Sequence, residues 1–131
     1  MEQLRIKIIR DLMYSKVKFW SVIDNEYLSL RVLVDTGARI TTFSDSALKR
    51  LGYITDKKPV TIRTGGGIAT ANEVTIPKIQ IGTVELTNVT AHSNEFLDNF
   101  KIKGILGMNV LSQFIFTVNL NDNIIILNRR N

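Results

Sequence analysis

Hydrophobic and polar positions alternate over short stretches along most of the chain, which is the pattern of half-buried β-strands. Residues 16–23 and 27–34 show this pattern first, and the Asp-Asn-Glu turn between them predicts a hairpin. Gly and Asn then separate further short apolar runs, at residues 60–63, 73–76, 79–81, 84–89, 114–120 and 124–127. The expected fold is therefore mostly β.

Helical spacing is confined to two short segments. Ser44 is a capping residue, the apolar positions after it fall on one helical face, and Gly52 ends the pattern. Residues 104–111 begin as a buried strand and continue as a second short helix. Residues 94–103 follow neither period, so we expect a loop there.

The chain has 131 residues, no Cys and one His. One hydrophobic core suffices at this length, so we expect a single domain over residues 1–131, with residues 1–14 as an N-terminal extension or extra strand. The residue types exclude disulfides, thiolate nucleophiles and Cys/His zinc sites, so we expect no metal and no cofactor. His92 has no second His nearby, which predicts a polar surface residue.

The net charge of +5 and the pI near 9.7 raise the question of nucleic acid binding. The basic residues are dispersed, however, and Lys57-Lys58 and Arg129-Arg130 are the longest pure basic runs. Aromatic residues do not alternate with them as a stacking platform requires, so we expect a solvated basic surface and no nucleic-acid partner. The N-terminal stretch mixes charged with apolar residues, so we expect a cytoplasmic protein that has no membrane partner.

An Asp-Thr-Gly sequence at residues 35–37 directly follows the second strand of the first hairpin. On its own it is a common turn composition. Its surroundings occur in a particular order: an apolar strand before it, the glycine-rich segment TGGGIATAN at 64–72, an Ile-Leu-Gly segment at 105–107, and a closing hairpin. This order resembles the retropepsin-like aspartic proteases, the single-lobe relatives of pepsin. The resemblance covers residues 20–127, and LVDTGA and GILGMNVL are its strongest signatures.

The resemblance implies a mostly β, single-lobe acid-protease closed β-barrel with one or two short helices, forming a two-fold homodimer. The implied function is that of an aspartic endopeptidase on peptide or protein substrates, with a water activated by Asp35 of both chains beneath a glycine-rich flap. Two chains are needed because this hydrolysis requires a pair of carboxyl groups and the chain has one Asp-Thr-Gly. The alternative is a non-catalytic peptide-binding or dimerisation module of the same fold.

The resemblance also assigns roles to single residues. It implies that Asp35, Thr36 and Gly37 are catalytic. It implies that the site is supported by Leu106, Gly107 and Asn109. The substrate-binding positions that it implies are Ala38, Arg39, Thr64, Gly65, Gly66, Gly67, Ile68 and Ile105.

The chain departs from the retroviral members of this family at two positions. Those members usually carry an acidic residue after the Ala of the motif and pair it with an Arg after the apolar-apolar-Gly segment. Here the two positions hold Arg39 and Met108, so both halves of that ion pair are replaced together. Arg39 then has two alternatives, to reach the cleft and favour acidic groups of the substrate or to point into solvent.

Overall fold

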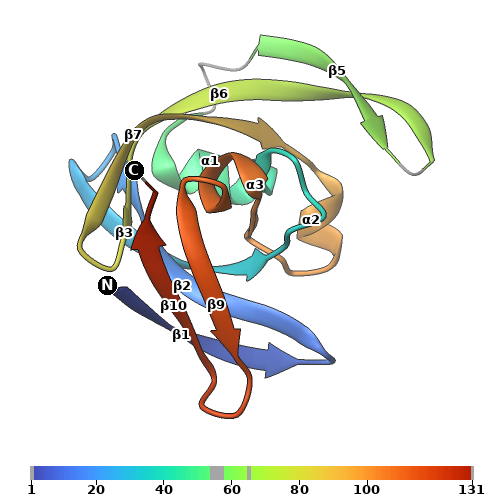
Figure 1. Cartoon of the computed structure of the whole chain (residues 1–131). Coiled ribbons are helices and arrows are strands. Elements are labelled where there is room, and N and C mark those ends of the chain that lie inside the picture. Colours follow the sequence, from blue (N-terminus) through green and yellow to red (C-terminus); the bar gives the residue numbers. More distant parts are fainter. Residues whose placement is uncertain (1, 54–57, 65, 131) are drawn as a thin grey trace.

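The computed structural model describes residues 2–53, 58–64 and 66–130. Strands dominate the described residues, and three short helices accompany them (Figure 1). The expectation of a mostly β chain is therefore confirmed. The elements are β1 (Glu2–Ile9), β2 (Leu12–Ser21), β3 (Glu26–Val34), β4 (Thr41–Phe43), α1 (Asp45–Leu51), β5 (Lys58–Thr64), β6 (Gly67–Ile81), β7 (Val84–Ser93), α2 (Phe96–Asn99), β8 (Gly104–Leu106), α3 (Met108–Leu111), β9 (Phe114–Asn119) and β10 (Ile124–Arg129).

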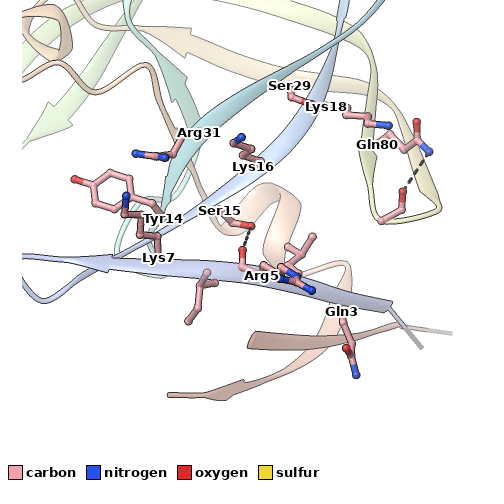
Figure 2. Close-up of a pocket in the computed structure, with 13 residues that line it drawn as sticks. Gln3, Arg5, Lys7, Tyr14, Ser15, Lys16, Lys18, Ser29, Arg31 and Gln80 are labelled. Carbon is pink, nitrogen blue, oxygen red and sulfur yellow. Dashed lines mark hydrogen bonds between the residues drawn. The ribbon is translucent and has the colours of Figure 1, made fainter. Parts of the chain in front are cut away.

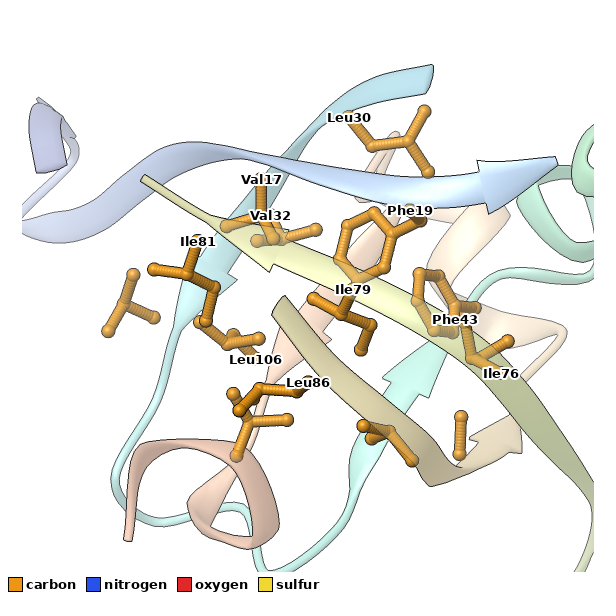
Figure 3. Close-up of a cluster of buried hydrophobic side chains, with 14 of the residues drawn as sticks. Val17, Phe19, Leu30, Val32, Phe43, Ile76, Ile79, Ile81, Leu86 and Leu106 are labelled. Atoms are coloured by element: carbon orange, nitrogen blue, oxygen red, sulfur yellow. The ribbon is translucent and has the colours of Figure 1, made fainter. Parts of the chain in front are cut away.

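The strands follow the order β5-β6-β7-β4-β8-β3-β2-β1-β10-β9. An additional pairing between β6 and β2 closes six of them, β6, β7, β4, β8, β3 and β2, into a ring. Apolar side chains from these strands fill the space inside the ring (Figure 3). Phe19 and Phe43 meet there edge to face, with ring centroids 4.9 Å apart, and neither side chain is exposed. The two-fold homodimer stays a prediction.

The N-terminal segment forms a strand, as one of the two alternatives for residues 1–14 predicted. Residues 2–5 of β1 pair with β10, whereas residues 6–9 pair with β2. Arg10 and Asp11 make the turn to β2, and both have positive φ, 51° and 65°. Two such residues form the turn type that matches the twist of a hairpin, so β2 begins at Leu12 rather than at residue 16.

The structure differs from the expected elements in two further places. The two expected strands at residues 73–76 and 79–81 form one continuous strand, β6. Pro77, which lies between them, is not paired with β7, but the residues on both sides of it are, so the strand continues through it. Asn88, opposite Pro77 in register, takes up the irregularity with a φ of 52°. The expected loop at 94–103 contains the short helix α2. Just before this helix, the Asn94 side chain accepts the N–H of Phe96, the first helical residue, at 2.8 Å.

None of the helices in the described part of the chain is long and apolar enough to cross a membrane. Helix α1 is the longest, with seven residues, and it forms where the sequence predicted it. Ser44 caps it, since its Oγ accepts the Ala47 N–H at 3.1 Å, and Gly52 ends it with a φ of 94°. This helix buries its apolar face against the ring.

Candidate active site

Asp35 lies at the end of β3, in the loop of residues 35–40 that leads to β4. Strands β3 and β4 are consecutive in sequence, yet β8 lies between them, parallel to β3 and antiparallel to β4. The Asp35 N–H donates to the Leu106 carbonyl of β8 at 3.1 Å. The loop therefore crosses the end of β8, and the hydrogen bond to Leu106 attaches the start of the loop to that strand.

Gly107 directly follows β8 and lies against the backbone of the loop. A Cβ at this position would lie 2.8 Å from the Ile40 carbonyl carbon, 2.9 Å from the Ala38 oxygen and 2.9 Å from the Thr41 nitrogen. All three are backbone atoms, which cannot rotate aside as a side chain could. Glycine is thus required here because the two segments of backbone are in contact.

Asn109 fastens the loop by several hydrogen bonds. Its Oδ1 accepts the Thr41 N–H at 2.8 Å and the Thr41 hydroxyl at 2.9 Å, and its Nδ2 donates to the Thr90 carbonyl at 2.8 Å. Its own N–H donates to the Arg39 carbonyl at 3.0 Å. The Gly107 N–H donates to the same Thr41 hydroxyl at 3.1 Å. The Asn109 side chain therefore joins α3 to β4 and β7, directly after the loop, and its backbone N–H binds the loop itself.

The Asp35 carboxylate is half-buried and is held from one side. Its Oδ1 accepts the Gly37 N–H at 2.8 Å, and Oδ2 has no hydrogen-bond partner within the described residues. A Cβ at Gly37 would lie 3.1 Å from Oδ1, so a side chain there would crowd the carboxylate. Thr36 is exposed, and its hydroxyl makes no hydrogen bond to the described part of the chain. One carboxylate oxygen and one hydroxyl are left available to a partner.

A cleft of about 800 Å³ lies between this loop and the first strand of the glycine-rich hairpin. The side chain of Arg39 is exposed and belongs to the lining of this cleft. Of the site residues expected from the sequence, Gly37, Ala38 and Arg39 belong to this lining. Asp35 is not itself a lining residue but lies two residues before Gly37, and the other expected residues within the described ranges that do not line the cleft are Thr36, Gly66, Gly67, Ile68, Ile105, Leu106, Gly107 and Asn109. The lining residues are Gly37, Ala38, Arg39, Ile40, Thr42, Val60, Thr61, Ile62, Glu73 and His92.

The tip of the glycine-rich hairpin is short. Thr64 of β5 pairs with Gly67 of β6, so the strands extend to the tip where residues 64–72 were expected to form a longer connection. Gly67 has a φ of 123°, a conformation that glycine adopts without strain. Ile68 is 73% exposed, and Gly66 is exposed as well. Gly65 and the Thr64 side chain lie outside the described residues.

Two titratable residues of the cleft were not found by sequence reasoning. His92 was predicted to be a surface residue, but it is buried, with 9% of its surface exposed. It lies opposite Glu73 in the β6–β7 ladder and also beside Thr42 of β4, and its Nε2 is 3.4 Å from Glu73 Oε2. This position follows from strand register, which one isolated His in the sequence does not reveal. Within the described ranges, no three acidic or His side chains gather as metal ligands.

The comparisons with known proteins agree with this geometry. The family model described as "gag-polyprotein putative aspartyl protease" matches residues 22–113. The crystal structure of a retropepsin-like aspartic protease from Rickettsia conorii matches with a TM-score of 0.73 and 26% identity, over 97% of this chain and 90% of that chain. The retroviral protease-like domain of Ddi1 from Leishmania major matches with a TM-score of 0.61 and 14% identity, over 92% of this chain and 90% of that chain, a likeness of fold. No curated protein matches the chain.

Proposed function

Because the chain belongs to the gag-polyprotein aspartyl protease family and has the retropepsin-like fold, we propose that it is an aspartic endopeptidase that works as a homodimer. The arrangement of Asp35 carries this proposal. Its carboxylate is fixed by the Gly37 N–H and by a loop bound to β8, and one of its oxygens has no hydrogen-bond partner among the described residues. Such a carboxylate is oriented before any substrate arrives, which is what a catalytic acid or base requires.

Catalysis needs a second carboxyl group, which a second copy of Asp35 supplies at a two-fold axis. Two adjacent carboxyl groups share one proton, because both cannot readily ionise together. The ionised group takes a proton from water as the water oxygen adds to the peptide carbonyl carbon, and the protonated group donates a hydrogen bond to the carbonyl oxygen. The C–N bond of the tetrahedral intermediate then breaks, the leaving nitrogen takes the proton that the first carboxylate received from water, and the pair of carboxyl groups is left with one proton again.

The exposure of Thr36 supports a contact between two such loops. A hydroxyl that makes no hydrogen bond inside the described chain is free to bond the backbone of a partner loop across the axis. The same contact would cover Asp35 and shield the pair of carboxyl groups, with the reacting water, from bulk solvent. In this proposal Thr36 and Gly37 position the carboxylates rather than react themselves.

The substrate is an extended peptide that lies in the 800 Å³ cleft, between the Asp35 loop and the β5–β6 hairpin. This hairpin acts as the flap, and Ile68 at its tip, now exposed, covers the bound peptide on closure. Backbone hydrogen bonds to an extended chain give affinity, and pockets select its side chains. Arg39, Glu73 and His92 make part of the lining polar, so polar substrate side chains fit beside them.

The test is cleavage of a diverse peptide library by the wild-type chain and by Asp35→Asn, compared across acidic to neutral pH by mass spectrometry. Asn keeps an oxygen that can accept the Gly37 N–H, so the fold should survive, as circular dichroism would check. We expect cleavage to fall by roughly 10²- to 10⁴-fold or more, because the general base is lost. Equal cleavage by both chains would place the activity elsewhere, and no cleavage by either would favour the non-catalytic module.

A further inference from the structure

A groove of about 590 Å³ opens where β1 separates from β2. The first half of β1 pairs with β10 and its second half with β2, so the two strands diverge at Arg5 and Ser15. We call this divergence of β1 from β2 the fork. The Ser15 hydroxyl donates to the Arg5 carbonyl at 2.9 Å and joins the two strands at the narrow end of the fork (Figure 2). The groove has no residue in common with the cleft beside Asp35.

The lining of the groove is strongly basic. Thirteen residues line it, and none of them is acidic. None of its cationic side chains makes an ion pair or hydrogen bond within the described residues, where the recorded ion pairs join Arg50 with Asp24 and His92 with Glu73. Glu2, the acidic residue of β1, is bound to the Thr83 hydroxyl. The five cations of the groove, which project from three strands (Figure 2), are Arg5, Lys7, Lys16, Lys18 and Arg31.

Two of these cations face each other in a position that costs stability. Lys16 of β2 is directly opposite Arg31 of β3 in the antiparallel ladder. Like charges in this position repel each other and destabilise the sheet unless an anion lies between them. The pair also lines a smaller cleft of about 370 Å³, which adds Lys101 and Lys103 to the same basic surface. Seven of the 17 Lys and Arg residues therefore line the groove and this adjoining cleft, and we call the surface that they form the basic track.

The aromatic residues near the track do not suit nucleic acid. Binding of single strands relies on aromatic faces on which bases stack, and Tyr14 is the one aromatic residue in the lining of the groove. Trp20 and Tyr27 are already packed against each other, with centroids 5.4 Å apart, and Lys78 covers the Trp20 ring at 4.1 Å. Burial and the hydrogen bond to Glu85 raise the pKa of Tyr27 to about 12, so that hydroxyl stays neutral and engaged.

The backbone of the fork suits a peptide. At Lys16 and Val17, β2 pairs with β3 on one edge, and no described strand pairs with its other edge. This free edge is two residues long, between the pairings of β2 with β1 and with β6, so an extended peptide can make a short backbone contact there. Lys16 and Lys18 project from the same face about 7 Å apart, the spacing at which alternate side chains of an extended peptide repeat.

We propose that the groove between β1 and β2 binds an acidic segment of a polypeptide in an extended conformation. The carboxylates of the segment lie between Lys16 and Arg31 and relieve their repulsion, while Arg5, Lys7 and Lys18 contact it from the two arms of the fork. The segment belongs to a substrate and is held outside the cleft, a part of the inference that rests on the proposed function. Arg31 precedes Asp35 by four residues of extended chain, roughly 13 Å, so one long polypeptide is able to reach both places.

The test is fluorescence anisotropy with a labelled peptide of alternating Glu and Ser, measured at low and at physiological salt. The full-length Asp35→Asn chain is used because it leaves the peptide intact, and the readout is binding, so failure of the proposed catalysis does not affect it. We expect saturable binding that weakens as salt rises. We expect the double variant Lys16→Glu/Arg31→Glu to bind about tenfold more weakly or worse, because attraction becomes repulsion.

Three controls make the result decisive. The double variant keeps a like-charge pair on the sheet, so its melting temperature should stay near that of the parent chain, and Arg5→Glu provides a second, independent loss of charge. Lys49→Glu on α1 changes the net charge by two units, as Arg5→Glu does, but lies outside the groove, so it should leave binding unchanged. Absence of binding, equal binding by the double variant, or tighter binding of single-stranded oligo(U) than of the acidic peptide would each overturn the proposal.

Discussion

At the scale of single residues, the hydrogen bonds of Asn109 hold the Asp35 loop and the start of β4 in place. We predict that Asn109→Ala destabilises the protein by about 1–3 kcal/mol for each group that it leaves buried and unpaired, here the Thr41 amide and the Thr90 carbonyl. Urea unfolding measures this loss. Asn128→Ala, in an exposed position of β10, is the matched control and should change stability little. Equal stability of the two variants would contradict the role of Asn109.

The same residues show which parts of the site a sequence can give. Asp35 and Gly107 stand in short motifs, because the proposed catalytic turn and a close backbone approach each demand one residue type at one position. His92 carries no such local signal. Its burial and its contact with Glu73 depend on how β4, β6 and β7 align, and that register is fixed by segments far apart in the chain.

At the scale of elements, local signals were reliable and long-range ones were not. The Ser44 cap and Gly52 predicted α1 because capping is settled within one or two turns of chain. The turn at Arg10 and Asp11 was missed because it lacks the Asn-Gly sequence typical of its type. The fork between β1 and β2 could not be foreseen at all, since it arises from the pairing of β1 with β10 near the other end of the chain.

The like-charge contact between β2 and β3 leads to a prediction about stability. We expect Lys16→Glu to raise the free energy of unfolding by about 0.2–1 kcal/mol, because a Glu opposite Arg31 replaces repulsion with attraction. Lys18→Glu is the matched control, since Lys18 lies opposite Ser29 and beside Gln80, which carry no charge. Thermal unfolding at low salt should separate the two variants, and added salt should bring them together. A gain of the same size in both would contradict the contact as its cause.

At the scale of the whole molecule, the fold concentrates charge that the sequence disperses. The sequence predicted a solvated basic surface because the longest basic runs have two residues. The five cations of the groove come from β1, β2 and β3, where each strand presents every second residue to the same side. Because side chains alternate along a strand, these cations are not consecutive in the sequence, and the basic surface that they form cannot be recognised from runs of basic residues. None of them lines the Asp35 cleft.

The proposed pair of Asp35 carboxylates predicts that an inactive chain inhibits an active one. When equal amounts of Asp35→Asn and wild-type chains exchange subunits at random, wild-type homodimers fall to about half, and activity should fall with them because a mixed dimer has one carboxylate. The measurement is the cleavage rate at saturating substrate after co-incubation, with the same amount of serum albumin as the control. Activity at high dilution should also fall faster than the enzyme concentration, since dimers dissociate. If Asp35→Asn leaves the rate unchanged although a tagged Asp35→Asn chain co-purifies with the wild-type chain, one chain suffices for catalysis and the shared pair is wrong.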